Sequence, residues 1–325
     1  MIKIAVTGAN GFVGSHLVSK LRNSEYDVSC LVRPGANIDL LDAKDKIIYV
    51  DYNDTKVLSE TILDCNVIIH NAGITRAKNW MQYQQVNVGL TANLLKLINK
   101  SSKVKQFIFI SSQAASGPAD DESSPKHESD KNVPVTMYGK SKLMAERIIR
   151  KNCLKSFTII RPVSVFGEGD KDFLQYYKLV KSKLAIKIGF KQKYLSLIYV
   201  EQLVEMISKT VLNEKAENET FFAVGTPKCS MNELISHIES IIGKKSFKVI
   251  IPNVLLYPAA AVSEFISIFT KKVSILNRDK INEFKENYWL ASSEKSAKIL
   301  GYKPENDLHA NLYKTYIWYK QKGWI

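Results

Sequence analysis

The chain has 325 residues, which is long enough for one large domain or two closely joined ones. Its 45% hydrophobic and 24% charged residues are typical of a globular protein that is soluble in water. The formal charge is +14, but all except seven of the 46 basic residues are lysines, and they are spread along the whole sequence. This distribution argues against nucleic-acid binding and favours a lysine-rich surface.

Four cysteines (Cys30, Cys65, Cys153 and Cys229) are scattered without metal-binding spacing, so we expect reduced thiols and no metal site. A predicted strand begins at Ile2, which leaves no room for a leader and predicts a cytoplasmic protein. The apolar stretch 254–269 is too short to cross a bilayer and contains Pro258 and Glu264. A buried helix is the favoured interpretation of this stretch, ahead of a peripheral membrane contact.

Short β-rich segments alternate with helical patterns through the first two thirds of the chain. This order predicts an α/β fold: a doubly wound parallel sheet of the Rossmann type, with helices on both faces. The expected strands are 2–7, 28–32, 47–50, 67–70, 107–111, 157–160, 195–199 and 220–224, and the expected helices are 14–23, 57–63, 86–99, 138–151 and 201–212. The polar segment 120–131 is expected to be a surface loop.

After Pro227 the pattern becomes mostly helical, which predicts a smaller C-terminal lobe. We expect residues 1–168 and 192–225 to form the dinucleotide-binding domain, and residues 169–191 and 226–325 to form the substrate-binding lobe.

The segment TGANGFVG (residues 7–14) places three glycines between a predicted strand and a predicted helix. Glycine permits a close approach of the backbone, and the N–H groups at a helix start bind anions. This context predicts a pyrophosphate-binding turn. Its candidate cofactor-binding residues are Gly8, Asn10, Gly11, Phe12, Val13 and Gly14.

Arg33 lies at the end of the second predicted strand, where an acidic residue would bind the free ribose hydroxyl of NAD. A guanidinium at this point suits the 2′-phosphate of NADP, so NADP is favoured over NAD. The alternative is that Arg33 stacks on the adenine of either cofactor.

Tyr138 and Lys142 stand four residues apart in a predicted helix, so they project from the same face. A nearby ammonium group is expected to lower the pKa of the phenol and make it a usable acid and base. Ser112 follows a predicted strand at the edge of the sheet where ligands bind. Together, Ser112, Tyr138 and Lys142 are the candidate catalytic residues.

These motifs resemble the extended short-chain dehydrogenases/reductases, also called the NAD-dependent epimerase/dehydratase family. The resemblance covers nearly the whole chain and includes HNAG (70–73), NVGLTANLL (87–95), YGKSK (138–142) and RPVSVFGEGD (161–170). It implies that Asp51 and Tyr52 flank the adenine and that Asn87 either orients Lys142 or braces its helix. Further cofactor contacts implied in the same way are Ala72, Gly73, Pro162 and Val163.

The residues around Ser112 separate the branches of this family. Gln113 and Ala114 stand where the sugar-nucleotide dehydratases carry an Asp-Glu pair, which argues against dehydration. The motifs resemble most closely the dihydroflavonol-reductase and 3β-hydroxysteroid-dehydrogenase branch, so we expect a reductase or dehydrogenase acting on a small molecule. The alternatives are a nucleoside-diphosphate-sugar epimerase and a non-catalytic dinucleotide sensor. The resemblance also makes a homodimer possible, paired through helices 86–99 and 138–151.

Overall fold

The computed structural model describes residues 1–52, 55–258, 278–304 and 307–325. Its centre is a parallel sheet of seven strands in the order β10-β6-β5-β4-β1-β2-β3. This is the doubly wound sheet that the sequence predicts. The strands are β1 (Lys3–Thr7), β2 (Asp27–Val32), β3 (Lys46–Tyr49), β4 (Val67–His70), β5 (Gln106–Ile110), β6 (Ser156–Pro162) and β10 (Glu219–Ala223).

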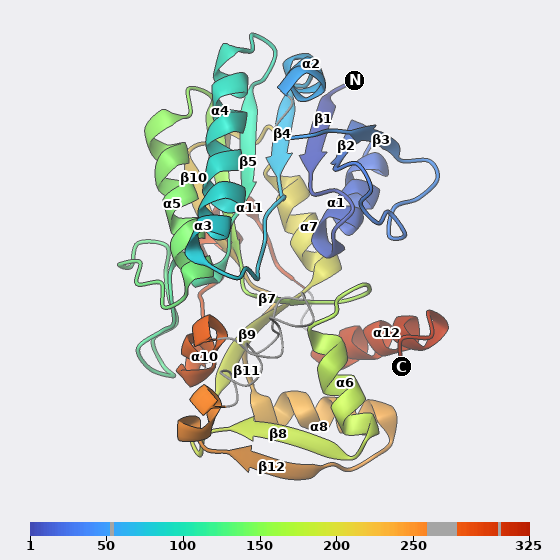
Figure 1. Cartoon of the computed structure of the whole chain (residues 1–325), viewed down its shortest axis with the longest axis vertical. Helices are drawn as coiled ribbons and strands as arrows, with labels where there is room; N and C mark the ends of the chain where they lie inside the picture. Colours follow the sequence, from blue (N-terminus) through green and yellow to red (C-terminus); the bar gives the residue numbers. More distant parts are fainter. Residues whose placement is uncertain (53–54, 259–277, 305–306) are drawn as a thin grey trace.

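Helices cover both faces of this sheet (Figure 1). Alternate side chains of each strand enter opposite layers; on β1, Ile4 and Val6 pack in one layer and Ala5 in the other. The first layer contains α1 (Phe12–Arg22), α7 (Val200–Lys209) and α11 (Glu294–Leu300). The second contains α2 (Thr55–Asp64), α4 (Leu90–Lys100) and α5 (Met137–Asn152). Helix α3 (Trp80–Tyr83) and a π-helical segment (Gln84–Gly89) precede α4.

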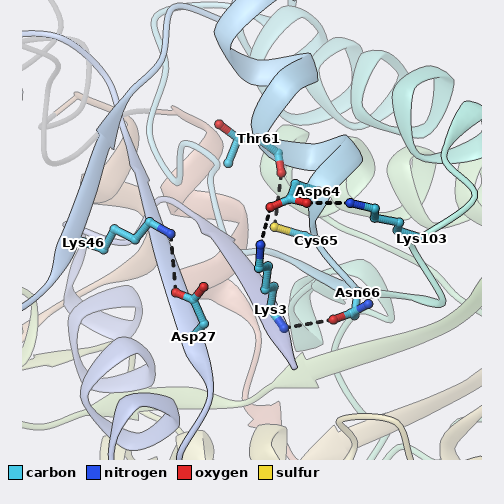
Figure 2. Close-up of polar contacts among 8 residues, drawn as sticks. All are labelled: Lys3, Asp27, Lys46, Thr61, Asp64, Cys65, Asn66 and Lys103. Atoms are coloured by element: carbon cyan, nitrogen blue, oxygen red, sulfur yellow. Dashed lines mark hydrogen bonds and ion pairs between the residues drawn. The ribbon is translucent and has the colours of Figure 1, made fainter. Parts of the chain in front are cut away.

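Ion pairs join neighbouring elements at the amino-terminal edge of the sheet (Figure 2). The Asp64 carboxylate accepts hydrogen bonds from Lys3 Nζ at 2.5 Å and Lys103 Nζ at 2.7 Å. The backbone N–H of Lys3 donates to Asn66 Oδ1 at 3.0 Å. The two lysines hold the pKa of Asp64 down to about 2. These contacts lie at the edge where the strands begin, away from the glycine turn that follows β1.

The second lobe adds two small sheets to the helices that the sequence predicts. A four-stranded sheet contains β7 (Ser164–Phe166), β9 (Tyr194–Tyr199), β11 (Thr226–Ser230) and β13 (Tyr288–Trp289), and a parallel pair contains β8 (Leu184–Ile188) and β12 (Phe247–Ile251). The helices here are α6 (Phe173–Lys181), α8 (Met231–Ile242), α10 (Arg278–Lys285) and α12 (Leu308–Gln321).

Residues 195–199, expected to return to the nucleotide-binding domain, instead pair with β7, β11 and β13 outside the seven-stranded sheet. The segment 120–131 is the surface loop that the sequence predicts, and Lys126 N in this loop donates to Leu290 O at 3.0 Å. In the apolar stretch 254–269, residues 254–258 are helical and bury Leu256 but expose Val254 and Leu255, and residues 259–269 lie outside the described residues.

Candidate functional site

The carboxyl ends of four neighbouring strands bring the predicted site residues to one edge of the sheet. The chain reverses direction across the sheet between β1 and β4, and such switch points are where open α/β sheets bind ligands. The glycine turn follows β1, Ala72 and Gly73 follow β4, Ser112 follows β5, and Val163 follows β6. The order of the strands therefore explains how segments more than 150 residues apart in the sequence meet.

The glycine turn has the geometry that a dinucleotide pyrophosphate requires. Gly8 has a φ of +66°, and a Cβ on Gly14 would come within 2.1 Å of the Gly8 carbonyl oxygen. A Cβ on Gly11 would meet only that same oxygen, at 3.3 Å, so its outer side is open. Helix α1 starts at Phe12 with no side-chain cap on its first N–H groups. The N–H groups of this first turn, among them that of Val13, can bind a pyrophosphate.

The adenosine end of the predicted cofactor site is built from loops after β1, β2 and β3. Asn10 Nδ2 donates to the Asn37 carbonyl at 2.8 Å and so fixes the glycine turn against the loop after β2. Arg33 is exposed at the end of β2, and its charge acts on the phenol of Tyr52. Tyr52 is partly buried, whereas Asp51 is exposed. The arrangement fits a cofactor whose adenosine lies along this edge.

Ser112 and Tyr138 line one cavity together with Pro162 and Val163, as the sequence predicts for a nicotinamide and substrate site. The cavity has a volume of about 200 Å³. The Ser112 hydroxyl accepts a hydrogen bond from Ala114 N at 3.1 Å, which fixes its position at the start of a 3₁₀ turn (Gln113–Ala115). Thr136 caps α5, because its hydroxyl accepts from Gly139 N at 3.0 Å. The cap sets where α5 begins and hence where Tyr138 projects.

The expected lowering of the Tyr138 pKa by Lys142 is not what the structure shows. Desolvation raises the pKa of Tyr138 to about 12, and the Ser112 hydroxyl opposes this rise. Lys142 Nζ instead donates to the Ile110 carbonyl at 2.7 Å and lies 4.7 Å from the centre of the Phe109 ring. Burial lowers the pKa of Lys142 to about 8, against the effect of the Glu146 carboxylate. The sequence correctly predicted that Tyr138 and Lys142 stand one turn apart on a helix, but it did not indicate that Lys142 donates to the Ile110 carbonyl.

Asn87 braces the loop after β4. Its Oδ1 accepts from Ile74 N at 2.8 Å, and its Nδ2 donates to Ile74 O at 3.0 Å and to Ser141 Oγ at 2.9 Å. These bonds join the π-helical segment to α5 and to the loop that contains Gly73. A Cβ on Gly73 would lie 3.0 Å from Asn87 Oδ1 and 3.4 Å from Lys142 Nζ, so this loop runs directly beside the candidate catalytic lysine.

A fully buried histidine, which the sequence analysis did not single out, holds the same loops together. His70 Nδ1 lies 2.7 Å from Thr7 Oγ1, and His70 Nε2 lies 3.1 Å from Thr91 Oγ1. Because Thr91 donates its only proton to the Asn87 carbonyl, Nε2 must donate to Thr91 and Nδ1 must accept from Thr7. Burial lowers the pKa of His70 to about 3, so the ring is neutral. In the sequence, this role was indicated by the HNAG segment, which begins with His70.

Three carboxylates and one amide in the cavity were also missed. Asp279 accepts a hydrogen bond from Met137 N at 2.6 Å, Asp172 pairs with Arg76, and Glu283 accepts from Lys280 Nζ at 2.7 Å. Gln113 lines the cavity as well, and its Nε2 is buried without a hydrogen-bond partner among the described residues. In the sequence, the only indication of this hydrogen-bond donor was that Gln113 directly follows Ser112.

A second cavity of about 430 Å³ continues from the first into the lobe. The two share Arg76, Ser164, Asp172, Leu195, Lys280, Glu283 and Trp289 in their walls. Most of the surface that lines the second cavity is apolar, and its charged residues include Lys187, Lys191 and Lys248 together with Asp170, Asp172, Glu283 and Glu286. A substrate that reaches Tyr138 therefore has room for a large second part in the lobe.

Residues 4–225 match the model of the NAD dependent epimerase/dehydratase family. The chain belongs to this family. It is 30% identical over 258 residues to UDP-glucose 4-epimerase of Vibrio cholerae, a match that covers 77% of this chain and 78% of that protein. It is 29% identical to N-acetyl-alpha-D-glucosaminyl-diphospho-ditrans,octacis-undecaprenol 4-epimerase of Escherichia coli O157:H7, covering 86% and 85% of the two chains.

Among solved structures, the fold is similar to that of a UDP-glucose 4-epimerase from Thermotoga maritima with UDP-glucose. The TM-score is 0.81 with 19% identity, over 99% of both chains. The family establishes an enzyme that depends on a nicotinamide dinucleotide. Among the described residues there is no cluster of three or more His, Cys, Asp or Glu side chains arranged for a metal, and no helix has the length and apolar character needed to span a membrane.

Proposed function

We propose that this protein is a 4-epimerase of a sugar carried on a diphosphate and that it depends on a nicotinamide dinucleotide. The observation that carries this proposal is the 30% identity to a UDP-glucose 4-epimerase over more than three quarters of the chain. A second similar relative is named as the 4-epimerase of a diphosphate-linked amino sugar. This reading replaces the reductase as the leading interpretation.

The composition of the catalytic cavity supports chemistry at a single carbinol. Tyr138 and Ser112 line it together, whereas each of its three carboxylates has a partner of its own. Dehydration needs a free acid and base beside the neighbouring carbon, and epimerisation at one carbon does not. These cavity residues therefore support oxidation and reduction at one carbon of the substrate.

The roles of the chain's own groups follow from their chemistry. In the phenolate form, Tyr138 takes the proton of the sugar hydroxyl as its carbon is oxidised, and the resulting phenol returns that proton when the opposite face is reduced. The Ser112 hydroxyl donates a hydrogen bond to the same sugar oxygen, and the Lys142 ammonium supports the negative charge that develops during the proton transfer. A bound nicotinamide dinucleotide supplies the acceptor and donor of the hydride. The unpartnered Nε2 of Gln113 offers a donor for a neighbouring sugar oxygen.

The second cavity supports a substrate with a diphosphate and a bulky carrier. Lys187, Lys191 and Lys248 supply positive charge along its wall, where basic residues outnumber the four carboxylates, which are Asp170, Asp172, Glu283 and Glu286. The chain has only one arginine after Arg161, so lysines take the place of the arginines that often bind diphosphates. For the cofactor, the exposed Arg33 supports acceptance of the NADP 2′-phosphate, a preference that is tested below.

The decisive experiment incubates the purified protein with UDP-glucose, UDP-N-acetylglucosamine or a polyprenyl-diphosphate-linked N-acetylglucosamine, with substoichiometric NAD or NADP. Proton NMR is recorded in D₂O. An epimerase inverts C4 and retains the C4 hydrogen, because the hydride leaves and returns without exchange. The matched control is Tyr138→Phe. Consumption of the oxidised cofactor in proportion to an oxidised product, without inversion, would instead establish a one-way dehydrogenase.

A further inference from the structure

One face of the β8–β12 pair is built of apolar side chains and open to solvent. Because β8 and β12 pair in parallel with Leu184 opposite Phe247 and Ile186 opposite Val249, these side chains project to the same side. Phe247 is 73% exposed and Leu184 is 40% exposed. The pair lies at the end of the molecule opposite the amino-terminal strands (Figure 1). We call these four side chains the β8–β12 face.

Exposed apolar side chains lie at both ends of this pair. Leu184 and Phe247 are exposed where the two strands begin. Where the strands stop, Ile188 and Ile251 pack with Leu256 and Ile281. Beyond that covered end, Phe190 is 73% exposed, and Val254 and Leu255 are also exposed. So many exposed large apolar side chains around one strand pair are uncommon unless something docks there.

The charged residues of the two strands and their flanking segments are all lysines, and the carboxylate that pairs with them here is the largely buried Glu239, 3.5 Å from Lys245 Nζ. The segments 183–191 and 244–251, which contain the two strands, hold six lysines and neither aspartate nor glutamate. Lys183, Lys244 and Lys245 flank the exposed end, and the Lys245 side chain is 92% exposed. Apolar side chains bordered by lysines complement a bilayer, where the former enter the acyl boundary and the latter meet anionic headgroups.

The same charges argue against a second copy of the chain as the occupant of the end where the two strands begin. A symmetric contact centred on that end would bring Lys183, Lys244 and Lys245 of one copy against those of the other. Ile186, Lys187 and Lys248 of the same strand pair also line the large cavity. A bilayer in contact with this face would consequently lie beside the wall of the substrate cavity.

We propose that the β8–β12 face, with Phe190, Val254 and Leu255, docks on a bilayer that contains anionic phospholipid. The docking is peripheral: apolar side chains enter the interface while the lysines bind phosphate groups. It requires no change in the seven-stranded sheet, and it does not depend on which sugar or alcohol the enzyme converts.

The test is co-sedimentation of the full-length protein with vesicles of phosphatidylcholine alone and of phosphatidylcholine with about one third phosphatidylglycerol. We expect binding to the second and at least a tenfold weaker partition to the first. The double variant Phe190→Ser/Phe247→Ser should lose about tenfold in partition to the anionic vesicles, and Lys244→Glu/Lys245→Glu should lose as much. The control is Leu154→Ser, because Leu154 is 78% exposed but lies after α5 in the nucleotide-binding domain.

Circular dichroism and binding of the cofactor show whether each double variant is folded. Both should match the wild type, because the double variants alter only exposed side chains. Wild-type protein that stays in the supernatant with anionic vesicles would overturn the proposal. So would apolar variants that bind as well as wild type, because a purely electrostatic contact would not use this face. A dimer that Phe190→Ser/Phe247→Ser dissociates, without vesicle binding, would assign the face to a second copy instead.

Discussion

Glu146 and Arg161 form a buried, two-pronged ion pair between α5 and β6. Glu146 accepts from Arg161 Nε at 2.9 Å and from Nη2 at 2.6 Å, and also from the Ser111 hydroxyl at 2.5 Å. Glu146 is one helical turn beyond Lys142, and Arg161 directly precedes Pro162 in β6. The pair thus fixes α5, which contains Tyr138, against the strand end that lines the cavity.

Removing one charge of this pair should be costly. Glu146→Gln leaves the Arg161 guanidinium buried without its counter-ion, and loss of one partner of a buried pair costs about 3–5 kcal/mol. Urea unfolding of the two proteins measures this loss in the free energy of unfolding. Glu205→Gln, which breaks an exposed pair with Lys209, is the matched control and should change stability by less than about 0.5 kcal/mol. Equal effects of the two substitutions would contradict the assignment.

Tyr138→Phe tests the proton transfer. Removal of the phenolic oxygen should lower kcat by about 10²-fold or more while the affinity for the cofactor stays near that of the wild type. Steady-state kinetics with a cofactor titration measures both. Tyr313→Phe, in the exposed part of α12, is the control and should retain full activity. A kcat of Tyr138→Phe within a few-fold of the wild type would exclude this tyrosine as the proton carrier.

His70 should make stability fall as the pH is lowered. Its pKa is about 3 in the folded protein and 6.5 in the reference state, so below pH 6.5 the unfolded chain binds a proton that the native ring does not. This group therefore contributes a loss of about 1.4 kcal/mol per pH unit below pH 6.5, continuing toward pH 3. Urea unfolding between pH 7.5 and about pH 5 should show this slope reduced in His70→Asn. His127→Asn should keep the slope of the wild type; an unchanged slope in both variants would sink the assignment.

Arg33 should set the choice of cofactor. A charge-assisted contact with a 2′-phosphate contributes about 1.5–3 kcal/mol, which corresponds to roughly ten- to a hundred-fold preference for NADP over NAD. Arg33→Ala should remove this preference mainly by weakening NADP, and Arg33→Asp should reverse it by repulsion. Fluorescence titration of NADPH and NADH into each variant decides the matter, with Lys105→Ala as a remote control. Equal losses for both cofactors would show that Arg33 only stacks on adenine.

Local patterns were enough to predict the nucleotide-binding part of the fold. The glycine turn, the alternation of strands and helices, and the Tyr138–Lys142 spacing all act within a few residues or a single helical turn, so they can be read from the sequence. The convergence of Ser112, Tyr138, Pro162 and Val163 followed from the rule that parallel strands end at one edge.

The parts that were missed depend on pairings between distant segments. β8 and β12 are separated by more than 50 residues, and β13 has only two residues, so neither has a local signal that fixes its partner. Asp279 contacts the start of α5 across 142 residues of sequence. The partner of Lys142 is a backbone carbonyl, and no residue type in a sequence identifies such a contact.

Strand β10 closes the sheet late in the chain. Its neighbour β6 ends at Pro162, more than fifty residues before β10 begins at Glu219, so during synthesis the outer edge of β6 emerges well before its partner exists. An unpaired strand edge is where nascent chains associate wrongly. Once β10 is in place, the Glu128 carboxylate accepts a hydrogen bond from its Phe222 N–H at 2.7 Å. The loop before α5 thereby occupies part of this edge of the sheet, where another chain could otherwise pair, and β3 forms the opposite edge.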